Sequence, residues 1–131
     1  MSYNLLLDTN FTKIDKHWKL TNCTYENGYL KATDYVFSIE QEIILPDPTK
    51  VYFSADYICF DKNIKSIYCG IFTEDGELKA TKKKPVIKSR KRISTIASLD
   101  VEKFKVMLII ESKIPNSKIY IDGPLLIDLN H

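Results

Sequence analysis

The alternation of apolar and polar residues with a period of two is the feature that most constrains the fold of this chain. It is clearest at 35–45 and 51–59. In the first segment, one face carries Phe37, Ile39, Gln41, Ile43 and Leu45. Successive side chains of a β-strand point to opposite faces, whereas a helix requires a period of 3.6. Both segments are therefore predicted to be strands with one buried face.

Turn-forming residues separate these two segments from further short ones. The turn signals are Asn27-Gly28, Pro46-Asp47-Pro48, 61–65, 74–77 and Pro115-Asn116. Further strands are predicted at 4–7, 17–20, on both sides of the turn at 27–28, and at 67–71, 86–87, 93–99, 104–111 and 118–127. The segment 99–105 is predicted to be a loop that enters a strand. About nine strands with turns every 8–12 residues or so predict an antiparallel β-sandwich or barrel.

Composition indicates one self-sufficient domain. The chain has 131 residues, of which 44% are apolar and 27% charged, enough for a hydrophobic core of its own. Residues 1–131 are therefore predicted to form a single domain. No apolar run approaches the roughly 18 residues that span a bilayer, so no membrane partner is expected. The apolar runs at 4–7 and 118–127 are expected to pack together and close the domain.

The start of the chain and its cysteines bear on its compartment. Residues 1–4 contain neither a basic segment nor an apolar one, so no signal peptide is expected and synthesis is predicted in the cytoplasm. Cys23, Cys59 and Cys69 are odd in number and show no C-x-x-C spacing. They are predicted to be free thiols that behave as small apolar residues, although Cys59 and Cys69 flank a turn and could lie opposite each other across a hairpin.

Several short motifs, in their order along the chain, resemble one known family. They are Asn4-Leu5-Leu6-Leu7 with Asn10-Phe11, then Trp18, Tyr29-Leu30-Lys31, Phe37 to Ile43 with its central Gln41, Lys50 to Asp56, and Ile119-Tyr120-Ile121-Asp122. Together they resemble the carbohydrate-binding modules of the galactose-binding-like type, a family also represented in bacteriophage virion proteins. The resemblance spans most of the chain. It implies an all-β fold, an antiparallel β-sandwich with jelly-roll topology, in which Gln41 is buried.

The same resemblance raises the question of a structural calcium ion. Members that bind calcium use carboxylates and carbonyls near both termini, which makes Asp8 and Asp122 the candidate ligands. The position after Asp122, acidic or an amide in the family, is Gly123 here and is followed by Pro124. This departure favours a turn in which Asp122 bonds backbone groups instead. Neither a metal nor another cofactor is predicted.

Little in the sequence indicates catalysis. His17 and His131 are the only histidines, and no G-x-S-x-G or H-E-x-x-H motif occurs. Glu40 and Glu42 share one face of a predicted strand, a spacing more typical of a solvated sheet face than of an acid–base pair. A small hydrolase is accordingly the third hypothesis, and the protein is predicted not to be an enzyme.

Sugar binding requires flat aromatic side chains beside hydrogen-bonding groups on an exposed face. The candidates are the tyrosines Tyr25, Tyr29, Tyr35, Tyr57 and Tyr68. The alternative for each is a half-buried ring of the sandwich with its hydroxyl at the surface. Trp18 is predicted to be a core residue.

The densest charge feature is a stretch of seven cations without an acid. Its members are Lys82, Lys83, Lys84, Lys88, Arg90, Lys91 and Arg92. One interpretation is a contact for an acidic protein surface. The other is a solvated hairpin whose lysines and Pro85 block pairing between sheet edges. Nucleic acid ranks lower because the stretch contains no aromatic residue for stacking.

These observations lead to three hypotheses of function. The first is a non-enzymatic module of a larger assembly, a bacteriophage virion component that decorates the capsid or belongs to the tail or fibre, with other proteins of that assembly as partners. In that case the protein is displayed on the virion after synthesis in the cytoplasm. The alternative is a carbohydrate-binding module that recognises a glycan. The fold itself hosts binding, adhesive and architectural roles, so it does not decide between them.

Overall fold

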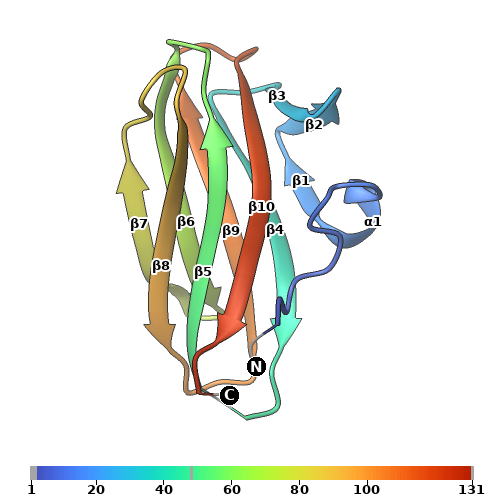
Figure 1. Ribbon diagram of the computed structural model, residues 1–131, viewed down its shortest axis with the longest axis vertical. Coiled ribbons are helices and arrows are strands. Elements are labelled where there is room, and N and C mark those ends of the chain that lie inside the picture. Colours follow the sequence, from blue (N-terminus) through green and yellow to red (C-terminus); the bar gives the residue numbers. More distant parts are fainter. Residues whose placement is uncertain (1–2, 48, 131) are drawn as a thin grey trace.

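The computed structural model describes residues 3–47 and 49–130, which form two antiparallel sheets of five strands packed face to face (Figure 1). Sheet A has the order β1 (Lys19–Thr21), β4 (Val36–Ile44), β9 (Lys103–Ser112), β6 (Ile64–Thr73) and β7 (Gly76–Lys83). Sheet B has the order β2 (Cys23–Glu26), β3 (Tyr29–Ala32), β10 (Lys118–Asp128), β5 (Lys50–Ile58) and β8 (Arg90–Ser98). The predicted all-β sandwich of jelly-roll type is confirmed.

The core lies between the sheets and is built from the alternating residues. The inward positions of β4, β5 and β9 are buried, including Phe37, Phe53 and Leu108. Gln41 occupies an inward position of β4, as the resemblance implies, and is also buried. Its amide oxygen accepts a hydrogen bond from the Leu7 nitrogen at 2.8 Å, and its amide nitrogen donates to the Leu7 oxygen at 3.0 Å. This polar side chain is buried because it replaces the strand partner that Leu7 lacks.

The segment at 4–7 lies beside β10 but is not a strand, so that prediction is wrong. Leu5 donates one backbone hydrogen bond to Leu126 at 2.9 Å, and the Asn4 side chain bonds the backbone of Pro124 and Leu126. Pro124 has no N–H, and the register of β10 against β5 shifts between Asp122 and Leu125. A regular ladder cannot form beside such a bulge, so side chains provide the contacts instead. The predicted packing of the two ends is confirmed.

A short helix, α1 (Ile14–His17), precedes β1 and takes up the first residue of the strand predicted at 17–20. The Asp8 carboxylate accepts hydrogen bonds from the backbone of Thr12 and Lys13 and from the Thr12 hydroxyl, all at 2.8–2.9 Å. Trp18 follows the helix, is only 3% exposed, and donates its indole N–H to the backbone carbonyl oxygen of Asp8 at 3.1 Å. Trp18 is therefore a core residue, as predicted. Among the described residues, no helix is both long and apolar enough to cross a membrane.

The basic stretch does not form the predicted hairpin. Lys82 and Lys83 end β7, while Arg90, Lys91 and Arg92 begin β8, and these two strands are the edges of different sheets. The residues between them cross from one sheet to the other. The strand predicted at 86–87 is reduced to an isolated bridge between Ile87 and Cys59. No strand was predicted at β7, because both of its faces are largely exposed and its sequence lacks an apolar alternation.

The cysteines are free thiols, as predicted. Cys59 follows β5 and Cys69 lies in β6, and these consecutive strands belong to different sheets. The two cysteines are thus not cross-strand neighbours in a hairpin. Burial raises the pKa of the Cys69 thiol. Burial also raises the pKa of Cys23 to about 11, although hydrogen bonds to the backbone lower it in part.

Candidate ligand-binding site

Three aromatic rings meet on the outer face of sheet B. Tyr29 of β3 and Tyr120 of β10 are direct cross-strand partners, and their ring centroids are 5.6 Å apart at an interplanar angle of 69°. Phe60, just after β5, contacts the other side of Tyr120 at 5.9 Å and 88°. Phe60 is 57% exposed and Tyr120 38%. We call Tyr29, Phe60 and Tyr120 the aromatic cluster; its edge-to-face contacts are the arrangement that aromatic rings prefer.

The loop that carries Phe60 is tied to the start of β10. The Asp61 carboxylate accepts two hydrogen bonds from Asn63, at 2.9 and 3.0 Å, and one from the backbone nitrogen of Lys118 at 3.2 Å. The Lys118 ammonium lies 4.8 Å from the centre of the Tyr29 ring. These contacts hold Phe60 beside Tyr120 although it lies outside a strand. An open hollow runs along this loop, lined among others by Phe60, Asn63 and Tyr120.

A charged network lies beside the aromatic cluster on the same face. The Arg90 guanidinium donates to the Asp56 carboxylate at 2.9 and 3.1 Å and to Asp122 at 2.6 Å. Arg92 donates from Nε to the other oxygen of Asp56 at 3.0 Å. We call Asp56, Arg90, Arg92 and Asp122 the arginine–aspartate network. It contains two cations and two anions and is therefore neutral as a whole.

The environment of Asp56 keeps its carboxyl ionised. Partial burial by itself raises the pKa of Asp56, but the hydrogen bonds and charges of Arg92 and Arg90 outweigh it and hold the pKa below its ordinary value. The pKa of Arg90 is raised in turn, first by its hydrogen bond to Asp122 and then by that to Asp56. Asp56, Arg90 and Arg92 are thus charged and hydrogen-bonded to one another at neutral pH.

Strand register makes the cluster and the network neighbours. Tyr120 lies opposite Ile58, which lies opposite Arg90; two residues along, Asp122 lies opposite Asp56, which lies opposite Arg92. Residues opposite one another share a face, and positions two apart on a strand are about 7 Å from each other. Flat apolar rings therefore stand next to charged hydrogen-bonding groups. This arrangement can hold a ligand with an apolar face and polar edges.

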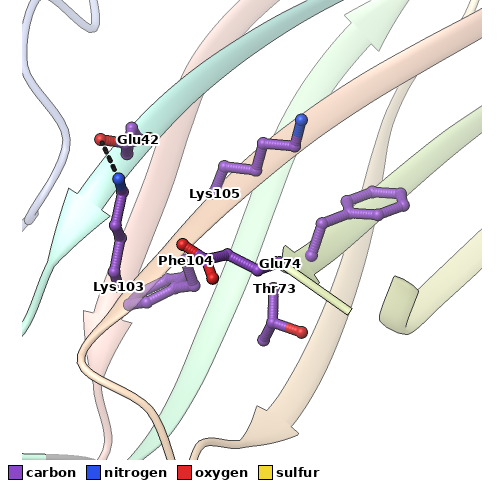
Figure 2. A pocket seen from close by; sticks show the side chains of 7 residues that line it. Glu42, Thr73, Glu74, Lys103, Phe104 and Lys105 are labelled. Carbon is purple, nitrogen blue, oxygen red and sulfur yellow. Dashed lines mark ion pairs between the residues drawn. The ribbon is translucent and has the colours of Figure 1, made fainter. Parts of the chain in front are cut away.

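A second hollow lies on the outer face of sheet A and encloses about 230 Å³. Figure 2 shows the Glu42–Lys103 ion pair on one side of it, Lys105 beside it and Glu74 with Thr73 at the end of β6. Phe72 also lines it. A Cβ on Gly70 would lie 2.6 Å from Cε1 of Phe72, so the ring covers the Cα of Gly70. This hollow offers one aromatic ring among charged groups.

Lys82 and Tyr68, two of the candidates from the sequence, contact each other elsewhere on the outer face of sheet A. The Lys82 ammonium lies 5.0 Å from the centre of the Tyr68 ring and 3.6 Å from the Glu111 carboxylate. Glu40 and Glu42 lie on this face as well, paired with Lys105 at 3.0 Å and Lys103 at 3.6 Å. Both carboxylates are therefore neutralised by lysines, which agrees with a sheet face and not with an acid–base pair.

The structure separates the remaining candidate tyrosines. Tyr57 is only 2% exposed, so its prediction as a sugar platform is wrong; it is a core residue. Tyr25 packs against Phe11 at 5.6 Å and is half-buried. Tyr35 is exposed but lines a separate hollow with Glu111. Only Tyr29 belongs to the aromatic cluster.

The candidate calcium ligands and histidines have other surroundings. Asp8 caps the turn before α1, and Asp122 binds Arg90 instead of the backbone groups predicted for it. Within residues 3–47 and 49–130, no group of three or more His, Cys, Asp or Glu side chains has metal-binding geometry. His17 lies at the end of α1, and His131 is outside the described residues.

Sequence reasoning missed Phe60, Tyr120 and Asp56, and it placed Arg90 and Arg92 in a basic stretch and Asp122 in a calcium site. The alternation of Ile119, Tyr120 and Ile121 does indicate an outward Tyr120. The alternation at 51–59 likewise puts Asp56 on the outward face, but nothing local pairs it with Arg90 or marks Phe60, because their partners are distant in the sequence.

The fold is shared with carbohydrate-binding modules. TmCBM61, solved in complex with β-1,4-galactotriose, matches with a TM-score of 0.69 at 12% identity, over 96% of this chain and 99% of its own. The CBM22-1–GH10 fragment of Clostridium thermocellum xylanase 10B, complexed with xylohexaose, matches with a TM-score of 0.64 at 12% identity, over 98% and 29%. The enzymatically active domain of bacteriophage CBA120 tailspike protein 4 matches with a TM-score of 0.61 at 10% identity. The match covers 94% of this chain and 21% of the tailspike chain.

These matches establish the class of fold: a jelly-roll β-sandwich of the carbohydrate-binding-module type. No protein-family model matches the sequence, and no curated protein matches it. This chain spans less than a third of the xylanase fragment and of the tailspike domain. In both matches, a unit of this size is one part of a longer chain.

Proposed function

We propose that this protein is a non-catalytic glycan-binding module whose binding surface is the outer face of sheet B. The observation that carries the proposal is the juxtaposition of the exposed aromatic cluster and the arginine–aspartate network. The likeness to modules solved with galactotriose and xylohexaose supports it. In this proposal the glycan replaces the larger assembly as the principal partner.

The chemistry of the face suits a sugar. The C–H face of a pyranose ring stacks on an exposed aromatic ring, here Phe60 or Tyr120, and its hydroxyl groups bond neighbouring side chains. Asp122, whose side chain is 61% exposed, offers acceptor oxygens, and Arg90 and Arg92 offer donors. Because each arginine is paired with an aspartate, the network carries no net charge. The network by itself therefore gives no preference for polyanions, and the one cation in contact with the aromatic cluster is Lys118 beside Tyr29 among the described residues.

The first test is a glycan array followed by titration calorimetry of the best ligand. Phe60→Ala and Tyr120→Ala are expected to lower affinity at least tenfold, because each removes an exposed ring. Phe72→Ala and Tyr68→Ala, which remove rings from the outer face of sheet A, serve as matched controls and are expected to leave affinity within twofold. The reverse pattern would move the binding site to sheet A. No binding to any glycan would overturn the proposed function.

A second candidate function is a component of a bacteriophage virion, synthesised in the cytoplasm and then displayed on the particle. The tailspike match supports it, and so does the basic stretch, in which Lys83, Lys84, Lys88 and Lys91 are exposed cations. This function is compatible with glycan binding. Mass spectrometry of particles purified by density-gradient centrifugation is the test. Co-migration with the particles is expected, and recovery only in the soluble fraction would contradict it.

A further inference from the structure

Strand β8 has an open edge without the usual protection. Within the described part of the chain, it is the last strand of sheet B and pairs only with β5, through nine consecutive residue pairs without a bulge. Its charges are confined to Arg90, Lys91 and Arg92, and 93–98 contains neither a charge nor a Pro or Gly. Edge strands of monomeric proteins normally carry charges, prolines or bulges against pairing with another chain. Strand β7, the edge strand of sheet A, carries such protection: it has lysines along its length and a register shift opposite Phe72.

A buried hydroxyl group lies at the middle of this edge. Thr95 faces the interior and is 4% exposed, like its neighbours Ile93 and Ala97 on the same face of β8. Among the described residues, the Thr95 hydroxyl has no hydrogen-bond partner. A buried hydroxyl without a partner is costly, and most such groups in folded proteins are satisfied. The hydroxyl is closed off from the outside in the single chain, so a second strand beside β8 would remove this cost by bonding a Thr95 side chain that rotates toward the open edge.

We propose that β8 pairs with β8 of a second copy of this chain, antiparallel about a two-fold axis through Thr95. In this register each Thr95 lies opposite the Thr95 of the other copy. Once both side chains rotate toward the axis, the two hydroxyls can bond one another, a favourable cross-strand pair. Ser94 lies opposite Ile96, which is 44% exposed in the single chain. The buried residues of one β8, Ile93, Thr95 and Ala97, then lie beside the same buried residues of the other β8.

Charge selects this orientation over a parallel one. Antiparallel pairing about Thr95 places the basic start of one β8 at the far end of the other, where Arg90 lies opposite Asp100. Parallel pairing in register would place Arg90, Lys91 and Arg92 beside the same three cations. Like charges directly opposite one another destabilise a sheet. A two-fold axis also closes the assembly at two copies, since each β8 has one open edge.

The dimer has a consequence for ligand binding, which rests on the proposed function. The two copies of sheet B become one sheet of ten strands, and their outer faces point to the same side. Two aromatic clusters then face one multivalent glycan, so that the second contact becomes intramolecular and avidity rises. Arg90 and Arg92 lie on β8 itself, which places both networks near the junction.

Disulfide cross-linking tests the register. Thr95→Cys places two thiols opposite each other across the axis, within the distance a disulfide spans. Ala97→Cys is the matched control on the same buried face: in the proposed register Ala97 lies opposite Ile93, and the two introduced thiols are offset by four residues, about 13 Å along the strands. Mild oxidation is expected to give a covalent dimer with Thr95→Cys and none with Ala97→Cys or the unmodified chain. Cross-linking of both variants, or of neither, would overturn the register.

Sedimentation equilibrium tests the dimer itself. The unmodified protein is expected at twice its chain mass of 15.2 kDa. Replacing both Ser94 and Ile96 by Lys gathers four cations at the axis and is expected to give monomers, as is the same double change to Glu. Mixing the two variants pairs Lys with Glu in the proposed register, so dimers are expected to return. Leu78→Lys, on exposed β7, is the control and is expected to stay dimeric.

The outcomes separate this inference from the proposed function. An unmodified protein that stays monomeric at all concentrations, or variant mixtures that do not associate, would overturn the dimer while leaving glycan binding untouched. Monomeric Lys variants that still bind glycan with single-site affinity, but lose avidity on a glycan-coated surface, are the expected result. A dimer without any glycan affinity would support the pairing of β8 and reject only the proposed function.

Discussion

Tyr29 and Tyr120 meet edge to face at 5.6 Å because they are direct partners in the register of β3 and β10. The pair fixes the aromatic cluster on two strands that are distant in the sequence. Phe60 joins it from a loop anchored by Asp61. The cluster is thus positioned by the fold, not by a local motif, and its exposed rings are available to a ligand.

The first prediction concerns Gly70 and Phe72. A Cβ on Gly70 would lie 2.6 Å from Phe72, so Gly70→Ala must displace the ring. We expect a loss of about 1 kcal/mol in the free energy of unfolding, at the low end for overpacking because the half-exposed ring can rotate. In the Phe72→Ala background the same change is expected to stabilise by about 0.5–1 kcal/mol, the usual advantage of Ala over Gly in a strand. Urea denaturation of the four proteins measures both, and equal effects in both backgrounds would show that the ring contact is unimportant.

The second prediction concerns the pH dependence of stability. The pKa of Asp56 is lowered in the folded state, where Arg92 and Arg90 outweigh partial burial. A carboxyl with a depressed folded pKa contributes stability above its unfolded pKa of about 3.9, and this contribution is lost as the pH falls through the folded pKa. Asp56→Asn is therefore expected to destabilise at pH 7 and to make stability depend less on pH below about 4. Thermal unfolding at a series of pH values is the measurement. If the melting temperature of Asp56→Asn falls with decreasing pH below about 4 as steeply as that of the unmodified protein, Asp56 is not the cause of the acid destabilisation.

The third prediction concerns Gln41 and the N-terminal segment. Its amide makes two hydrogen bonds to Leu7. Gln41→Ala removes both hydrogen bonds, and at roughly 0.5–1.5 kcal/mol for each we expect a loss of about 1–3 kcal/mol in the free energy of unfolding. Hydrogen exchange should speed up at Leu5 and Leu7 well before β5 and β9 are affected. Glu42→Ala, one residue along on the exposed face, is the control. Unchanged exchange in the N-terminal segment would contradict the role given to Gln41.

The fourth prediction divides the basic stretch into two parts. Replacing Lys83, Lys84, Lys88 and Lys91 by Gln should leave the melting temperature within a few degrees, because exposed charges contribute roughly 0–1 kcal/mol each. Replacing Arg90 and Arg92 by Gln leaves Asp56, whose side chain is 15% exposed, without its cations and is expected to lower the melting temperature more, although two charges change instead of four. Thermal unfolding by circular dichroism measures both. Equal shifts would contradict the separate role of the arginines.

The sequence contains enough information for the sandwich and for most of its strands. Period-two alternation located β4 and β5 because one face of each is buried. It missed β7, where both faces are largely exposed and no alternation is required. The strand prediction at 4–7 is wrong because Leu5 and Leu6 pack on the core without a ladder, and their apolar character alone resembles a strand.

The candidate site was less accessible to sequence reasoning. Tyr57 falls on the apolar face of the alternation at 51–59, so the pattern that predicts the strand already indicates an inward ring, whereas the outward position of Tyr29 follows from its register with Tyr120. Arg90 was assigned to a basic run because its acidic partners, Asp56 and Asp122, are more than thirty residues away in the sequence. Contacts between strands that are far apart in the sequence define this site.

Chemical-shift mapping with the best glycan from the array tests the central claim most directly. The account predicts that backbone and side-chain shifts cluster on the outer face of sheet B, at Tyr29, Phe60, Tyr120 and Arg90, while Tyr68 and Phe72 on sheet A remain unperturbed. Shifts centred on the outer face of sheet A, with the aromatic cluster unaffected by saturating glycan, would contradict it.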